Sequence, residues 1–160
     1  MYRLFFICIA MTVKDYIEIA SLVKSQILDE TSRAVYQKEV EIIKLNTEDQ
    51  LFNKGINIEG GLLGLYSHTY LPKEGSLMRA YPKTKNKRYN FLESGRLYND
   101  MSIRVVNNQV IFENSDTGNK LLELRSLVGA EFIGLTSDNE YRLNYEIIQP
   151  ELFKFIQKYL

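Results

Sequence analysis

Few side chains in this 160-residue chain are of the types that catalyse reactions or bind metals. The chain has one histidine, His68, and one cysteine, Cys8. The residues around His68 show no order of nucleophile, base and acid that predicts a catalytic triad, and one cysteine with one histidine cannot build a zinc site. A lone cysteine also closes no internal disulfide, which is typical of a reducing compartment. We therefore expect no catalytic residue, no metal and no cofactor, and we expect that the protein is not an enzyme. A small hydrolase centred on His68 is the rival interpretation.

Two other patterns resemble functional sites but lack essential parts. The segment "GGLLG" at 60–64 is rich in glycine. It has neither the lysine and hydroxyl residue of a phosphate-binding loop nor the strand and helix context of a dinucleotide fold. Several acids lie on a predicted helix, where such charges normally form the solvent face. These acids are Glu30, Glu39, Glu41, Glu48 and Asp49.

A cluster of cations beside tyrosines is the one pattern that points to a ligand. The cluster lies between Tyr81 and Tyr89, and a mixture of cations and aromatic rings can hold a phosphate backbone and stack bases. The other interpretation is a solvated loop, because charges commonly gather in loops. The whole chain has 20 Lys plus Arg and 20 Asp plus Glu, so any contact with nucleic acid has to be local. The candidate backbone-contact or DNA-channel residues are Lys83, Lys85, Lys87 and Arg88.

The first residues, "MYRLFFICIAM", contain an apolar run from Leu4 to Ala10. The run is short for a secretory signal, and it leads into a charged helical pattern without a small-residue cleavage site. Two further interpretations remain. Residues 1–11 are a strand or apolar arm that docks on a partner, or translation starts at Met11. No stretch of the chain approaches the roughly 20 apolar residues that span a membrane, so we expect no membrane contact.

A long amphipathic helix is predicted after this arm. Apolar residues recur at three- and four-residue steps over 12–28, and Thr12 with Asp15 resembles a capping box. The apolar pattern resumes after the polar patch at 29–33, so the helix is expected to continue to about Phe52, bent near the patch, with Gly55 as its stop.

Residues 53–90 form a long irregular segment with five of the nine glycines. The pattern at 103–113 then predicts a β-hairpin, since Asn107 and Asn108 tolerate the positive φ of a tight turn. Two strands alone are unstable, so the hairpin must pack on the long helix or on another chain.

The C-terminal part predicts more helix. Residues 119–129 predict a short helix closed by Gly129. Thr136 or Ser137 can cap the next helix, and Glu140, three residues after Ser137, is the expected capping-box partner. Pro150 starts the last helix. The expected fold is a single α+β domain over 1–160, with a long N-terminal helix packed on a small antiparallel sheet, a long loop and C-terminal helices.

Three segments, read in order, resemble tailed-bacteriophage morphogenesis proteins of the tail-completion and head-tail joining type. They are "QLFNKGINIEGGLLGLYS" (50–67), "NFLESGRLYNDMSIRV" (90–105) and "FIGLTSDNEYRLNYEIIQPELFKFI" (132–156). Such proteins carry a leucine, an Asp-Thr-Gly or similar turn, and then an aromatic residue or leucine and a small residue before a strand. Later they carry a Phe-x-Gly-Leu-Ser/Thr turn before a C-terminal helix. Here these parts are Leu92–Tyr98 and Phe132–Thr136, with Glu-Ser in place of Asp-Thr.

The resemblance implies a structural virion protein of the head-to-tail connector (neck) or tail-completion (terminator) region. Its partners would be further copies of itself in a ring homo-oligomer and other phage neck, portal or tail proteins, with transient contact to genomic DNA. It would reside in the neck or tail of the virion and assemble in the cytoplasm of the host bacterium. A small nucleic-acid-binding module that uses residues 83–89 is the alternative. The candidate subunit-interface residues are Leu4, Phe5, Phe6, Ile7, Ile103, Val105, Val110 and Phe112.

The same resemblance gives residues 92–98 a structural role. Gly95 lets the chain turn where a side chain would clash, and Leu92, Leu97 and Tyr98 anchor the turn in the core ahead of the hairpin.

Overall fold

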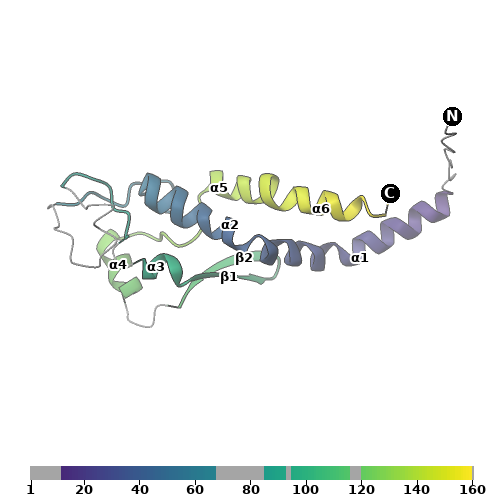
Figure 1. Ribbon diagram of the computed structural model, residues 1–160, viewed down its shortest axis with the longest axis horizontal. Helices are drawn as coiled ribbons and strands as arrows, with labels where there is room; N and C mark the ends of the chain where they lie inside the picture. The colour runs from purple at the N-terminus through teal and green to yellow at the C-terminus, as the bar shows by residue number, and fades with distance from the viewer. Residues whose placement is uncertain (1–11, 68–84, 93–94, 116–119, 160) are drawn as a thin grey trace, which may run out of the picture.

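The computed structural model describes residues 12–67, 85–92, 95–115 and 120–159 (Figure 1). The fold is α+β, as the sequence predicts, with a long N-terminal helix, a two-stranded antiparallel sheet and C-terminal helices. The helices are α1 (Val13–Gln37), α2 (Glu39–Lys44), the π-helix η1 (Leu45–Lys54), α3 (Arg96–Asn99), α4 (Lys120–Val128), α5 (Ser137–Arg142), the π-helix η3 (Leu143–Ile148) and α6 (Gln149–Ile156), and the strands are β1 (Met101–Val106) and β2 (Gln109–Asn114).

The helices α1, α2 and η1 follow one another along one side of the molecule. The Thr12 hydroxyl accepts from the Asp15 N–H and the Asp15 carboxylate accepts from the Thr12 N–H, so the predicted capping box is confirmed. Gly55 ends η1 with φ 62°, also as predicted. The bend is not in the polar patch but at Lys38, whose φ of −105° and ψ of 14° separate α1 from α2. The patch is helical throughout, and within it the Thr31 hydroxyl donates to the Ile27 carbonyl one turn earlier.

The hairpin forms where the sequence predicts it. Met101 pairs with Asn114 and Val106 with Gln109, and the turn residues Asn107 and Asn108 have φ of 50° and 61°. These values fit the two-residue turn whose twist matches that of paired strands. Ile103 lies in the core beside α1 and α2, so the long helix supports the hairpin.

The core has two parts along the length of the molecule. One gathers side chains from α1, α2, η1, β1 and η3, and the other joins η1 to the loops and α4. The first cluster is Ala34, Val35, Ile42, Leu45, Ile103, Leu143 and Ile148, and the second is Leu51, Leu63 and Phe132 with half-buried neighbours around them.

The turn at Gly95 lies next to the second cluster. Gly95 begins α3 with φ 78°, Leu92 is buried, and Leu97 and Tyr98 pack against the cluster. Burial raises the pKa of the Tyr98 hydroxyl, which donates to the Asn90 carbonyl. The structure therefore confirms the predicted anchoring role of this turn.

The C-terminal helices α5, η3 and α6 form one run that lies antiparallel to α1 and α2, and α1 begins beyond the end of α6 (Figure 1). Thr136 caps α5 by accepting from the Asn139 N–H, so Ser137 is not the cap and Glu140 falls one residue past the capping-box position. Pro150 lies in the first turn of α6, where its missing N–H costs least. No helix in the described part of the chain is long and apolar enough to cross a membrane.

Candidate functional site

A buried polar network joins η1 to the segment that precedes α5. Three of its amide side chains, those of Asn46, Gln50 and Asn139, have no exposed surface. Asn46 Nδ2 donates to the carbonyls of Phe132 and Gly134 at 2.9 and 2.6 Å. These bonds hold a chain segment that is more than 80 residues distant in sequence against the π-helix.

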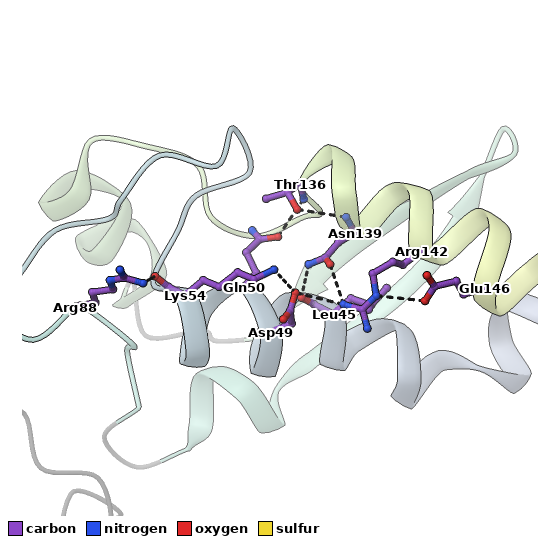
Figure 2. Close-up of polar contacts among 9 residues, drawn as sticks. All are labelled: Leu45, Asp49, Gln50, Lys54, Arg88, Thr136, Asn139, Arg142 and Glu146. Atoms are coloured by element: carbon purple, nitrogen blue, oxygen red, sulfur yellow. Dashed lines mark hydrogen bonds and ion pairs between the residues drawn. The ribbon is translucent and has the colours of Figure 1, made fainter.

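Figure 2 shows the second half of this network, which centres on Asn139. The Thr136 N–H donates to Gln50 Oε1 at 3.0 Å, and the Asn139 N–H donates to Thr136 Oγ1 at 3.4 Å. Asn139 Nδ2 donates to the Leu45 carbonyl at 2.8 Å, the first carbonyl of the π-helix. Buried polar groups need such partners, so the network fixes how α5 meets η1.

Charged side chains surround a groove of about 390 Å³ between α2, η1, the end of α5 and η3. Arg142 Nη1 lies 3.4 Å from Asp49 Oδ2, and Arg142 Nε lies 3.4 Å from a Glu146 carboxylate oxygen (Figure 2). Lys54 Nζ contacts the same Asp49 oxygen at 2.8 Å. Burial raises the pKa of the Asp49 carboxyl, but Lys54 and Arg142 lower it more, so this pKa lies below its ordinary value. Asp49 is thus an ionised partner of two cations.

The acidic side chains of this groove take part in ion pairs within the chain. Within the described ranges, no three His, Cys, Asp or Glu side chains are placed to hold a metal ion. The expectation that the acids form only the solvent face is wrong at Asp49, and also at Glu39, whose carboxylate accepts from the Ile103 N–H. His68 lies outside the described residues.

The described members of the cation and tyrosine cluster have different environments. Lys85, Lys87 and Arg88 are all exposed, and Arg88 Nη1 also donates to the Lys54 carbonyl at 3.2 Å, at the C-terminal end of η1 (Figure 2). Tyr89 lies edge-on to Tyr66, with ring centroids 4.8 Å apart, and packs against the second core cluster. It cannot also stack on a base. Lys83 and Tyr81 lie outside the described residues.

The predicted interface residues fall into three groups: one is buried, three are half-buried and four lie outside the described residues. Ile103 is 6% exposed and belongs to the core of its own chain, so it is not available to a neighbouring subunit. Val105, Val110 and Phe112 are half-buried against that core, and their part in an interface stays a prediction. Leu4, Phe5, Phe6 and Ile7 lie outside the described residues.

Helix α1 carries an exposed apolar face, and none of the interface residues predicted from the sequence lies on it. Val13, Tyr16, Ile17 and Leu28 are 79%, 62%, 61% and 55% exposed. A groove of about 400 Å³ continues this face, and it is lined mostly by apolar residues of α1 and by Ile156 of α6, with Lys24 as its charged member. The sequence showed the helical period of these apolar residues. It did not show that the first turns of α1 extend beyond the end of α6 and are therefore left uncovered (Figure 1).

Comparison with protein-family models, with curated proteins and with solved structures finds no match for this chain.

Proposed function

We propose that this chain is a non-enzymatic structural protein of a tailed-bacteriophage virion, in the head-to-tail connector or tail-completion region. Copies of it form a ring-like assembly that joins portal, neck or tail proteins. The sequence resemblance supports the virion context, and the exposed apolar face of α1 is the observation that supports assembly.

The apolar face of α1 costs free energy in an isolated chain. Tyr16 and Ile17 lie three and four residues after Val13, next to it on the helix surface, and each of the three is more than 60% exposed. Burying a large apolar side chain stabilises by about 1.5–3 kcal/mol. Single exposed apolar residues are normal on a monomer, but a contiguous group of them is typical of a protein interface. A neighbouring subunit that covers this face would gain several such contributions at once.

Several charged groups on the surface are paired within the chain. Arg142 forms ion pairs with both Asp49 and Glu146, and Arg88 donates to a carbonyl at the end of η1. These charges stabilise the fold. These charged groups are thus engaged within the chain, whereas the apolar face of α1 is left exposed.

The first test compares two serine substitutions on α1. Ile17 lies on the apolar face, and Leu22, which is 41% exposed, lies five residues further on and so about 140° around the helix. We expect the wild-type chain to form rings or discrete oligomers by light scattering and negative-stain imaging. Ile17→Ser should lower the oligomer mass, and Leu22→Ser, the matched control, should preserve it. Equal masses for wild type and Ile17→Ser at every concentration would contradict an assembly surface on α1.

The nucleic-acid-binding alternative has a separate test. If Lys85 and Lys87 contact a phosphate backbone, binding to DNA should weaken steeply as salt rises, and the double alanine variant should show a smaller salt slope. The assembly proposal expects the double variant to form the same oligomers as the wild type. Absence of DNA binding at low salt would remove the alternative.

A further inference from the structure

The two edges of the hairpin differ in how their backbone groups are bonded. On β1, the Ile103 N–H donates to Glu39 Oε1 at 3.3 Å and the Val105 N–H donates to Tyr36 Oη at 3.2 Å. These N–H groups point away from β2 and are satisfied by side chains of α2 and α1. The outer edge of β1 is therefore covered by the chain itself.

The outer edge of β2 is open in the described structure. Ile103 is paired with Phe112 and Val105 with Val110. Backbone groups of an antiparallel pair alternate between facing the partner strand and facing away from it. Since Ile103 and Val105 face away from β2, the backbone groups of Phe112 and Val110 face away from β1. No third strand among the described residues pairs with β2.

A groove of about 570 Å³ runs along this open edge. Residues 108–112 line one side, and the other side includes the apolar residues Ile58, Ile133, Leu135 and Leu143. A strand within a sheet takes about 160 Å³ per residue, from the spacing of strands, the spacing of sheets and the rise along a strand. The groove thus has room for roughly three to four residues of an added strand, with apolar side chains directed at its apolar wall.

The segment "RLFFICIA", residues 3–10, has the composition that such a groove requires. Its phenylalanines and isoleucines favour strands, and it has one charged residue. Strand addition takes its affinity from main-chain hydrogen bonds and its selectivity from alternate side chains in pockets.

The dimensions of α1 show which copy can supply this segment. Tyr36, which contacts β1, is 24 residues from Thr12, so the hairpin lies about 36 Å along the helix from the point where the segment attaches. A fully extended chain covers at most about 3.6 Å per residue, so the three residue steps from Thr12 to Ile9 span at most about 11 Å and the eight steps to Leu4 at most about 29 Å. The segment cannot lie along β2 of its own chain.

We propose that three to four consecutive residues within 3–10 of one subunit add as a strand to the outer edge of β2 in the next subunit. Each copy then gives one strand and receives one, a head-to-tail contact that closes into a ring when the rotation between subunits allows it. This inference rests on the proposed function because it requires self-association. It deepens that function by assigning the contact to β2 and to the apolar segment.

Cross-linking through the natural Cys8 tests the contact. Ile111→Cys places a second thiol on β2, and Glu123→Cys, on the exposed face of α4, is the matched control. A short bismaleimide tolerates either facing of Cys8. We expect at least tenfold more intermolecular cross-link with Ile111→Cys than with Glu123→Cys, loss of that product when Cys8→Ser is added, and a peptide that joins residue 8 to residue 111 in mass spectrometry. Equal yields from the two variants would overturn the proposal.

A substitution pair within the segment separates this contact from the one on α1. Phe6→Pro removes a backbone N–H and is poorly compatible with a paired strand, whereas Phe6→Val keeps an apolar residue that favours strands. We expect Phe6→Pro to lower the cross-link yield at least tenfold with an unchanged melting temperature, and Phe6→Val to change the yield less than twofold. If Ile17→Ser dissociates the oligomer but Phe6→Pro does not affect it, strand addition is wrong and the proposed function stands. If the wild-type chain neither cross-links nor associates, both fail.

Discussion

Replacing Asn139 with alanine tests whether the buried polar network holds the fold together. Asn139 has no exposed surface, its Nδ2 donates to the Leu45 carbonyl at 2.8 Å, and its Oδ1 accepts from Arg142 at 3.3 Å. Arg142 keeps its contacts with Asp49 and Glu146 in the variant, so the main loss is at Leu45. A buried carbonyl without its donor costs about 1–3 kcal/mol.

The missing side-chain atoms add to this cost. A residual cavity costs about 24 cal/mol per Å³, so a void of a few tens of Å³ adds about 1 kcal/mol. The total is about 2–4 kcal/mol. In a chain of this length each kcal/mol lowers the melting temperature by about 2–4 °C, so we expect Asn139→Ala to melt about 4–16 °C below the wild type.

Asn144→Ala is the matched control, because Asn144 is exposed on η3 five residues further along. Thermal unfolding followed by circular dichroism, with calorimetry as a second measurement, would compare the two variants with the wild type. The control should stay within about 1 °C, as surface substitutions usually do. The reasoning is refuted if Asn139→Ala melts together with Asn144→Ala, since the buried amide would then contribute nothing measurable.

Two further predictions concern η1. Gly55→Ala should be more destabilising than Gly60→Ala in thermal unfolding, because both have positive φ but an added Cβ would lie 2.7 Å from the Tyr89 carbonyl oxygen at Gly55 and meets nothing within 4 Å at Gly60; equal melting temperatures would contradict the close approach. The contacts of Asp49 with Lys54 and Arg142 lower the pKa of its carboxyl although burial raises it. The ionised carboxyl therefore stabilises the fold above the unfolded-state pKa of about 3.9, and this contribution is lost as the pH falls through the lower folded-state pKa. The difference in urea midpoint between the wild type and Asp49→Asn should therefore shrink between pH 6 and pH 3, and a difference that does not depend on pH would argue against this contribution.

The local signals were read correctly because the residues that make them are neighbours in sequence. The Thr12 capping box, the Asn107–Asn108 turn and the positive φ of Gly55 and Gly129 each depend on a few consecutive residues. Patterns of this kind fixed where helices and strands begin and end to within a few residues. The bend near residues 29–33 was misplaced because polar residues on an exposed helix face do not interrupt the helix.

The buried network could not be predicted in the same way. Asn46, Gln50 and Asn139 bond to backbone groups 86 to 94 residues away in the sequence. In the sequence each of them looks like an ordinary polar residue of a helix. Their complete burial and their hydrogen bonds across the chain arise only when the C-terminal helices pack against η1, which is a property of the tertiary structure.

What the sequence by itself determined is the order of elements, their caps and turns, and the absence of a recognisable catalytic pattern, because these follow from residue types at short spacing. The tertiary structure alone decided which apolar surfaces the chain covers. The same amphipathic period describes the buried side of α1 at Ala34 and Val35 and its exposed side at Val13 and Ile17. Only the length of α6 and the position of the hairpin show which part of that stripe, and which edge of the sheet, is left for a partner.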